Sequence, residues 1–421
     1  MNTATLVVGI AELVQPAAKE GDGRSPIEVT RDAALLFAGG IIIAAGPRAT
    51  VAAHPRAHRA AALDVGGRAV VPGLVDSHTH VLFAGDRIDE LARRTRGETY
   101  ESIARAGGGI ARSAAAVRDA SVEALVDATL PRIDSMISRG TTTVEAKSGY
   151  GLSPEAELKQ LRAISALAAL RPVDVIATAL AHAIPPEFET ERQRYVSLFC
   201  TEVLEVAARE ALARYCDVFV ASIAFTPDEA RTIAAAARAL GLGLRLHVDQ
   251  LADDGGAALA AELGALAADH LEHTGAAGRT RLAESRVIAT LLPGCALFQA
   301  DALWPDGRAL RAAGCEVAVA TDCNPGSSML TDLTLCASVA ATRCGLSLEE
   351  ALWAVTCGGA RALGLLDRGR LVPGEIADFV VVDAADWRAL LYWPGDSRIW
   401  GVFKRGDRIF SGDRRTDEDD A

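Results

Sequence analysis

Two histidines separated by a single residue, His78 and His80, stand just after an apolar segment of the chain. The segment Val70–Val75 is apolar and partly β-branched, which is typical of a buried strand. On an extended backbone, residues i and i+2 point to the same face, so the two imidazoles would meet beyond the end of the strand. Neutral imidazole is the commonest side-chain ligand of metal ions, and the spacing therefore indicates part of a metal site. A pair of solvated loop histidines is the alternative that the spacing alone leaves open.

The chain from residue 70 to 365 alternates between short β-rich runs and helical runs rich in Ala, Leu, Glu and Arg. Eight alternations over this length favour an α/β fold of the (β/α)8 or TIM barrel type, which typically needs roughly 250 residues. A doubly wound open sheet is disfavoured, because no Gly-x-Gly-x-x-Gly motif follows the first strand. The predicted strands are Val70–Val75, Thr141–Glu145, Val175–Leu180, Val218–Ala221, Leu244–Leu246, Ala265–Ala268, Val287–Leu292 and Val317–Ala320.

Two of the intervening segments carry clear helix starts. Ser153-Pro154-Glu155 and Thr226-Pro227-Asp228-Glu229 each place a capping residue before a proline and acidic residues in the first turn. Helices are therefore expected to follow these two points, as the alternating pattern of a barrel requires.

Active sites of such barrels lie at the C-terminal ends of the strands, and polar residues fall just past the predicted strand ends. Six of the eight histidines lie there, whereas His54 and His58 lie in a polar N-terminal stretch. Any one of the six could be a structural residue, but random placement would scatter the set. The chemistry-bearing residues at strand ends are His78, His80, Lys147, His182, His247, His270, His273 and Asp322.

Three imidazoles and one carboxylate from this group, His78, His80, His247 and Asp322, form a predicted metal-ligand set. Nitrogen and oxygen ligands with one open position suit a catalytic Zn²⁺ or Fe²⁺. Such a metal lowers the pKa of its bound water toward 7, so metal-bound hydroxide would be the nucleophile at neutral pH. Asp322 would accept the proton of the water and deliver it to the leaving group, as general base and then acid.

Longer motifs around these residues resemble the amidohydrolase superfamily and, within it, the imidazolonepropionase family. His-x-His specifies only the superfamily, whereas the run Lys147–Leu152 and the turn after Asp322 narrow the resemblance to the family. The matching segments are Pro72–Arg87, Ala106–Ile110, Thr141–Leu152, Ala181–Glu187, His247–Leu251, Ala268–Glu272, Leu292–Gly294 and Ala320–Ser328, in order over most of the barrel.

The resemblance implies hydrolysis of the ring amide of 4-imidazolone-5-propanoate to N-formimidoyl-L-glutamate, a step of histidine degradation. It also implies that the four predicted ligands bind one divalent metal. His270 and Gln250 would join Asp322 in the catalytic group, and His182 and His270 could polarise the carbonyl or steer protons. The residues that would contact substrate are Arg87, Tyr150, His182, Gln250, Asn324, Gly326 and Ser327. Arg87 could grip the propanoate carboxylate with its planar guanidinium.

The sequence lacks two residues that related enzymes use, a metal-bridging lysine and a proton-donating glutamate. The segment Val220–Phe225 after the fourth strand has no lysine that could bridge two metals once carboxylated, so one metal is expected. Lys147 is the only lysine in a comparable setting, and a loop salt bridge is its simpler role. Related ring deaminases tend to carry Glu where Gln250 stands, and Gln cannot protonate departing ammonia. Gln250 thus argues against a deaminase, unless Asp249 compensates.

Two other functions stay open at this point. One is another mononuclear amidohydrolase, such as a ring deaminase or a hydantoinase-like cyclic amidase. The other is a catalytically silent barrel, which the complete ligand set disfavours. Metal analysis of the purified protein would distinguish a catalytically silent barrel from an active enzyme. Arg87, Tyr150 and the turn Asn324–Ser327 favour a substrate with an acidic side arm over a neutral ring.

Composition limits the partners. The net charge of −12, with both signs interspersed, argues against a nucleic-acid or acidic-membrane partner. No apolar run reaches the roughly 18–20 residues of a membrane span, and no secretory signal is recognised at the N-terminus. The eight cysteines include no Cys-x-x-Cys pair, which is typical of reduced thiols in a cytoplasmic protein. A homodimer acting on a small anionic substrate is expected from the resemblance.

The two ends of the chain differ from the barrel region. Residues 1–68 and 371–421 are rich in β-type and turn residues, and Leu35–Ile43 resembles a hairpin around Gly39-Gly40. We expect them to build one small β-sandwich domain together, with residues 69–370 forming the catalytic barrel. The charged end Arg414–Ala421 is expected to fray.

Overall fold

A computed structural model describes residues 3–17, 26–98, 102–103, 106–300 and 302–412 of the chain. Its larger sheet has eight parallel strands hydrogen-bonded in chain order, which confirms the barrel and excludes a doubly wound sheet. The strands are β5 (Leu74–Asp76), β6 (Thr141–Lys147), β7 (Asp174–Ala181), β8 (Tyr215–Phe219), β9 (Gly243–Val248), β10 (Ala267–His270), β11 (Ile288–Leu291) and β12 (Val317–Val319).

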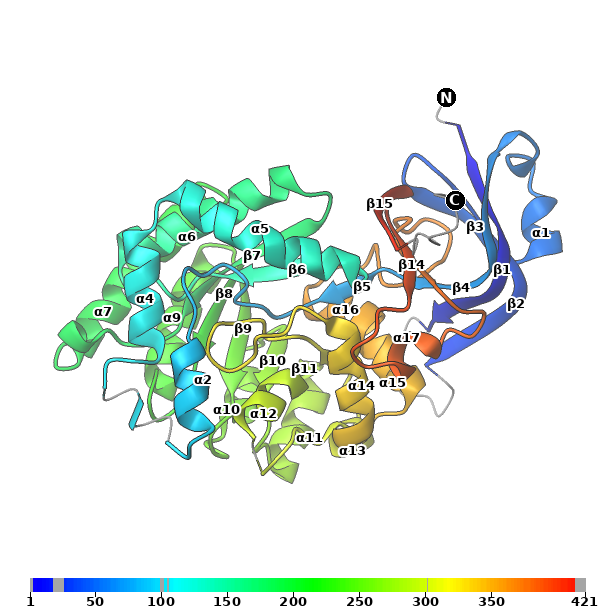
Figure 1. Ribbon diagram of the computed structural model, residues 1–421. Coiled ribbons are helices and arrows are strands. Elements are labelled where there is room, and N and C mark those ends of the chain that lie inside the picture. Colours follow the sequence, from blue (N-terminus) through cyan, green and yellow to red (C-terminus); the bar gives the residue numbers. More distant parts are fainter. Residues whose placement is uncertain (1–2, 18–25, 99–101, 104–105, 301, 413–421) are drawn as a thin grey trace.

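Helices surround the barrel on the left of Figure 1. The predicted starts are confirmed: Ser153 caps α6 and Thr226 forms a capping box with Glu229 at α9. The helices between and after the strands are α2 (Ile88–Arg94), α4 (Ile110–Asp119), α5 (Val122–Ser138), α6 (Pro154–Leu170), α7 (Arg192–Leu198), α8 (Glu205–Arg209), α9 (Pro227–Ala239), α10 (Gly256–Glu262), α11 (Ala276–Ser285), α12 (Pro293–Gln299), α13 (Gly307–Ala312), α14 (Leu333–Arg343), α15 (Leu348–Trp353), α16 (Gly359–Ala362) and α17 (Ala389–Tyr392).

The first predicted strand is wrong in its extent. Val70, Val71 and Pro72 end β4 (Ala61–Pro72), which belongs to the other sheet, and only Leu74–Asp76 forms barrel strand β5. Gly73 marks the change of sheet, where an added Cβ would lie 2.4 Å from Thr142 Oγ1. The last four residues of β4 and all of β5 are buried, so apolarity alone did not reveal the break. The predicted fourth and sixth strands are displaced by two to three residues from β8 and β10.

The second sheet is built from both ends of the chain, on the right of Figure 1. Gly39 and Gly40 both have positive φ and join β2 to β3, which confirms the predicted hairpin. This terminal sheet runs β15-β14-β13-β4-β1-β2-β3, with β1 (Thr5–Pro16), β2 (Ile27–Ala38), β3 (Ile41–Pro47), β13 (Phe379–Val382), β14 (Ile399–Lys404) and β15 (Asp407–Ser411), and α1 (Arg48–Ala52) follows β3. The domain division near residue 68 stays a prediction, and Arg414–Ala421 lie outside the described residues.

The segments after β5 and β12 join the two ends of the barrel sheet. The backbone N–H of Asp322 donates to His78 O over 3.0 Å, and the N–H of His80 donates to Cys323 O over 3.0 Å. Thr79 and Cys323 form a parallel bridge between these hydrogen bonds. The barrel is therefore joined through the backbone of three of the four predicted metal ligands.

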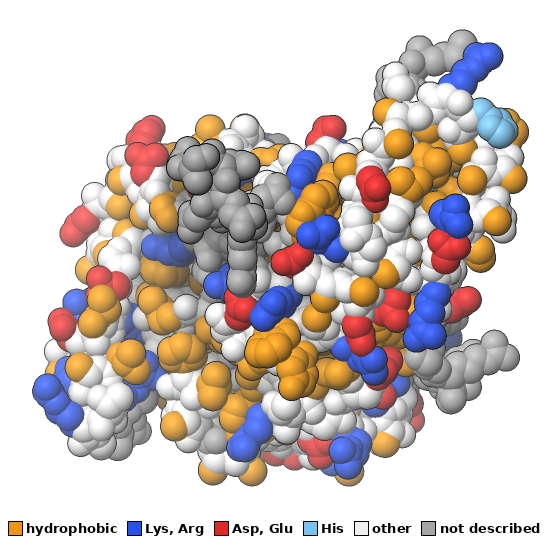
Figure 2. Space-filling model, turned by 45° about the vertical axis from the view of Figure 1, so that its right-hand side comes forward, with side chains coloured by type: hydrophobic (Ala, Val, Ile, Leu, Met, Phe, Trp, Pro, Cys, Tyr) orange, Lys and Arg blue, Asp and Glu red, His pale blue; other side chains and the backbone are white. Residues whose placement is uncertain are grey.

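The face in Figure 2 intersperses basic and acidic side chains, with hydrophobic groups between them. Across the described ranges, no helix combines the length and the apolarity needed to cross a bilayer. All eight cysteines are free thiols, and seven of them are buried.

Candidate active site

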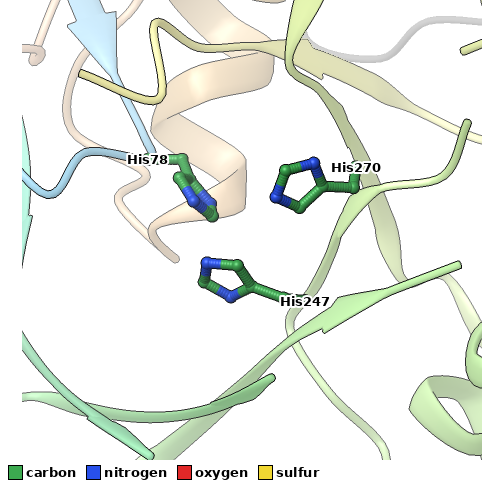
Figure 3. Close-up of side chains that lie close together, drawn as sticks. All are labelled: His78, His247 and His270. Atoms are coloured by element: carbon green, nitrogen blue, oxygen red, sulfur yellow. The ribbon is translucent and has the colours of Figure 1, made fainter. Parts of the chain in front are cut away.

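The four predicted metal ligands converge at the C-terminal end of the barrel. Asp322 Oδ1 lies 3.6 Å from His78 Nε2 and 3.5 Å from His80 Nε2. His247 Nε2 lies 3.3 Å from His80 Nε2. His270 is close as well, and its ring shares a compact group with those of His78 and His247 in Figure 3. Two groups whose ligand atoms could hold a metal, His78–His247–His270 and His78–His80–Asp322, therefore share His78.

The protonation pattern of these histidines fits a divalent metal. His78 Nδ1 lies 2.8 Å from Asp269 Oδ2, and His247 Nδ1 lies 3.1 Å from Asp217 Oδ1. A carboxylate at Nδ1 holds the proton there and leaves the Nε2 lone pair for a metal. The buried Nε2 of His78 has no hydrogen-bond partner among the described residues. Burial, with nearby positive charge, holds the pKa of His78 well below its usual value, so its imidazole is neutral.

Lys147 was expected to form a simple salt bridge in a loop, but it lies at the end of a strand. It is the last residue of β6, and its Nζ donates to Glu145 Oε1 and Asp217 Oδ2 over 2.7 Å each. Burial lowers the pKa of Lys147, but Asp217 and Glu145 offset this and the pKa is raised. Lys147 therefore forms buried ion pairs with two carboxylates.

His270 is paired with an acid that the sequence analysis did not single out. His270 ends β10 with a φ of 83°, and its Nδ1 lies 3.4 Å from Glu272 Oε1. Burial lowers the pKa of His270, but the charge and hydrogen bond of Glu272 more than offset it, so the pKa is raised. The signal was present in the sequence, since the acid follows the histidine at a spacing of two.

One cleft is lined by every residue that was predicted to contact substrate and by three of the four predicted metal ligands. Only His78 is too deeply buried to line it. The cleft also contains residues that the sequence analysis missed, among them Arg94, seven residues after Arg87 and so on the same helical face. The lining comprises His80, Arg87, Arg94, Ile110, Tyr150, His182, Phe219, Ile223, His247, Gln250, Leu251, His270, Gln299, Asp322, Asn324, Gly326 and Ser327.

Arg87 stands at the start of α2 and is held by an acid one turn later. Its Nε and Nη2 donate to Glu90 Oε2 over 2.7 and 2.6 Å. Glu90 Oε1 also accepts from Gly109 N over 2.9 Å. Burial raises the pKa of Glu90, but the hydrogen bonds from Arg87 and Gly109 hold it below its usual value. The guanidinium is therefore fixed in direction before any substrate arrives.

The turn Asn324–Ser327 links Arg87 to Asp322. Asn324 Oδ1 accepts from the N–H groups of Gly326 and Ser327 over 2.8 and 2.7 Å, while its Nδ2 donates to Asp322 Oδ2 over 3.0 Å. A Cβ at Gly326 would collide with the Arg87 guanidinium, so glycine allows this guanidinium to lie against the turn. Burial raises the pKa of Asp322 to about 6.

Tyr150 and His182 form one wall of the cleft. Their ring centroids lie 5.3 Å apart, and His182 lies 5.2 Å from His80. His182 Nδ1 lies 3.1 Å from Gly149 O, which orients its ring. Burial and the neighbouring His247 lower the pKa of His182 to about 3, so this imidazole is neutral.

Gln250 and Asp249 point to different places. Gln250 lines the cleft, and its Nε2 lies 3.6 Å from Cys295 Sγ. Asp249 instead accepts from Gly256 N, Ala257 N and Thr274 Oγ1, over 2.8, 3.1 and 2.8 Å. The expectation that Asp249 could compensate for Gln250 is therefore wrong, because the start of α10 captures its carboxylate.

Sequence comparisons identify the family of the chain. The sequence model of the amidohydrolase family matches residues 69–409. A curated imidazolonepropionase from Caulobacter vibrioides is 47% identical over 384 residues, or 90% of this chain and 95% of its own. The imidazolonepropionase from Deinococcus radiodurans is 44% identical over 410 residues, or 96% of this chain and 99% of its own.

Structural comparisons support the fold. An adenosine deaminase from Xanthomonas campestris superposes with a TM-score of 0.69 at 20% identity, covering 96% of this chain and 92% of its own. Atrazine chlorohydrolase from Arthrobacter aurescens gives a TM-score of 0.74 at 18% identity, with 97% and 95% covered. At these identities the likeness shows the architecture alone.

Proposed function

Since the chain belongs to the imidazolonepropionases of the amidohydrolase family, we propose that it hydrolyses the ring amide of 4-imidazolone-5-propanoate to N-formimidoyl-L-glutamate. The observation that carries the proposal is the turn Asn324–Ser327. Its Asn324 donates to the carboxylate of Asp322 at the metal-ligand cluster, and its Gly326 packs against the guanidinium of Arg87 in the same cleft. One substrate that carries both a ring amide and an acidic arm would engage both ends.

A metal cofactor follows from the family and from the grouped His and Asp side chains. We propose one divalent ion per chain, Zn²⁺ or Fe²⁺, held by His78, His80, His247 and Asp322. Nitrogen-rich ligation with one carboxylate suits both ions. When bound, the metal would lower the pKa of a water molecule and polarise the substrate carbonyl.

Asp322 would take the proton from the attacking water and pass it to the ring nitrogen that leaves. Its Oδ2 accepts from Asn324 Nδ2, which fixes the direction of the carboxylate. Proton transfer by a positioned side chain contributes on the order of 10²–10⁴-fold to a rate. His270, oriented by Glu272, would donate a hydrogen bond toward the oxygen of the substrate carbonyl as negative charge develops there.

The substrate would be oriented by the remaining residues of the cleft. Arg87 would bind the propanoate with its planar guanidinium, next to the polar groups of Gly326 and Ser327. Tyr150 and His182 would flank the ring. Gln250 would bind the ring through its amide, and as a neutral side chain it would not supply the proton that a departing ammonia needs. This favours ring opening over deamination.

A coupled assay tests the proposal. 4-Imidazolone-5-propanoate would be generated in situ from urocanate, and its ultraviolet absorbance followed with metal-analysed protein, with and without a chelator. Chelator-sensitive decay to N-formimidoyl-L-glutamate is the expected result. A metal-loaded protein that leaves this compound untouched would contradict the proposal, and a panel of cyclic amides and aminated heterocycles would then be tested.

We also propose the role in histidine degradation, a cytoplasmic location and a homodimer, for which the family resemblance is the support. Sedimentation of the purified protein and cell fractionation test the last two.

A further inference from the structure

Lys147 has no place in the proposed reaction, yet it is among the largest completely buried side chains of the described residues. It is the last residue of β6, and its partner Asp217 lies on β8. Its Nζ bonds to Glu145 Oε1 and Asp217 Oδ2, both 2.7 Å away and both completely buried. Removing charges from water is costly, and a buried ion pair is by itself weak support for a role in stability. The arrangement therefore calls for another reason.

Each of the two carboxylates that bind Lys147 also forms a hydrogen bond to a predicted metal ligand or to the residue between two of them. The second oxygen of Asp217, Oδ1, lies 3.1 Å from His247 Nδ1. The second oxygen of Glu145, Oε2, accepts from the backbone N–H of Thr79 over 3.0 Å. Thr79 stands between His78 and His80, and its Oγ1 donates to Glu145 O over 2.6 Å. One ammonium thus fixes groups that reach both sides of the cluster.

His78 is held by a similar chain of hydrogen bonds. Its Nδ1 lies 2.8 Å from Asp269 Oδ2, and Arg245 Nη2 donates to both oxygens of Asp269 over 3.2 and 3.1 Å. The same Nη2 donates to Ser77 O over 2.9 Å. Two of the predicted ligand histidines therefore each contact a buried carboxylate, and a buried cation contacts that carboxylate in turn and fixes its direction.

We propose that Lys147 is a positioning residue of the metal centre, which holds His247 through Asp217 and the His78–His80 segment through Glu145 without touching the metal. The inference rests on the proposed metal-dependent function. Without the ammonium, Asp217 and Glu145 would repel one another, and the histidine and backbone that they orient would lose their alignment. The metal affinity would fall, although no ligand had been removed.

Lys147→Met tests this, because methionine retains an unbranched side chain and removes the charge. Lys404→Met is a matched control. Lys404 is also buried, and its Nζ also bonds to two carboxylates, Asp174 at 2.8 Å and Asp378 at 2.6 Å. Neither Asp174 nor Asp378 is a predicted metal ligand, and the described part of the chain shows no hydrogen bond from either to a predicted ligand. Zn²⁺ affinity of the full-length apoprotein would be measured by chelator competition, and the Co²⁺ absorption spectrum would report ligand geometry. Thermal unfolding would measure the stability loss in both variants.

The expected result is Zn²⁺ binding weakened about 10–100-fold in Lys147→Met, with an altered Co²⁺ spectrum, and unchanged metal binding in Lys404→Met. Equal metal affinity in Lys147→Met and the unmodified protein would overturn the proposal. An equal loss in both variants would also overturn it, because it would reflect general destabilisation.

If Lys147→Met does not fold, the Asp217→Asn variant tests the same connection from its other end, with Asp378→Asn as its control. Weakened Zn²⁺ binding in Asp217→Asn alone would support the proposal, and equal affinity in the two variants would reject it. These measurements need no substrate. A protein that binds Zn²⁺ but leaves the imidazolone intact would therefore contradict the proposed function and not this inference.

Discussion

His80 and His247 face each other with their Nε2 atoms 3.3 Å apart. Two imidazole lone pairs repel at this distance, so a proton or a cation has to lie between them. Because Asp217 holds the Nδ1 proton of His247, its Nε2 carries a lone pair. The pair is thus prepared for a shared metal ion, and this leads to the first prediction.

Removing the metal should abolish activity and lower the thermal stability of the protein. A ligand present at about 100 times its Kd stabilises the folded state by about 2.7 kcal/mol, which is lost in the apoprotein. Activity assays and thermal unfolding before and after chelation measure both effects. Adding back Zn²⁺ or Fe²⁺ should restore them, and an apoprotein with full activity would contradict the proposed metal site.

Asp322→Asn should keep the fold and reduce kcat by at least about 100-fold. The amide retains the size of the side chain and can still meet Asn324, but it cannot take a proton. Turnover would be measured on protein saturated with metal, because Asp322 is also a predicted ligand. Near-normal kcat in a metal-loaded variant would show that another group is the base.

Arg87→Lys should raise KM by roughly 10–100-fold with a smaller effect on kcat. Lysine keeps a positive charge beside Glu90, so the buried acid stays paired, but it lacks the fork that binds a carboxylate through two hydrogen bonds. A ring substrate without the acidic arm is the control, since its KM should not change. An unchanged KM for the acidic substrate would remove Arg87 from the anion site.

Glu272→Gln should lower kcat roughly tenfold, a part of the effect of a positioned acid–base group, and leave KM almost unchanged. The amide keeps an acceptor for His270 Nδ1 but removes the charge that raises the pKa of this imidazole. Steady-state kinetics at several substrate concentrations separate the two constants. If kcat equals that of the unmodified protein, His270 does not depend on Glu272.

Asp174→Asn should destabilise the protein at neutral pH by about 1–3 kcal/mol, and the difference should shrink in acid. Burial raises the pKa of Asp174, but Lys404 and Arg368 lower it below its usual value. A depressed pKa contributes stability above the unfolded-state pKa of about 3.9, and this contribution is lost as the pH falls through the folded-state value. Urea unfolding from pH 7 to about pH 3 measures the trend, and a difference independent of pH would contradict it.

The periodic features of the fold were predictable. Alternating strands and helices, capped starts such as Thr226 and the glycine pair at Gly39 are local signals, and each appears in the structure where it was expected. The division between β4 and β5 was not predictable. Val70 and Leu74 are equally buried apolar residues, and the sheet that each joins depends on strands distant in the sequence: Val70 pairs with β1 and β13, and Leu74 pairs with β6.

The candidate site divides in the same way. The residue types that follow each strand can be read from the amino-acid pattern, which predicted His78, His80, His247 and Asp322 as metal ligands. The family resemblance added the substrate contacts, among them Arg87 and the turn that begins at Asn324. The hydrogen-bond partners of the buried side chains became visible only in the folded chain: Asp249 bonds to the start of α10, Glu272 to His270, and Lys147 to two carboxylates. The physical reason is that strand periodicity is local, whereas hydrogen bonds between buried charges join residues from different strands, and only the closed barrel sets their distances.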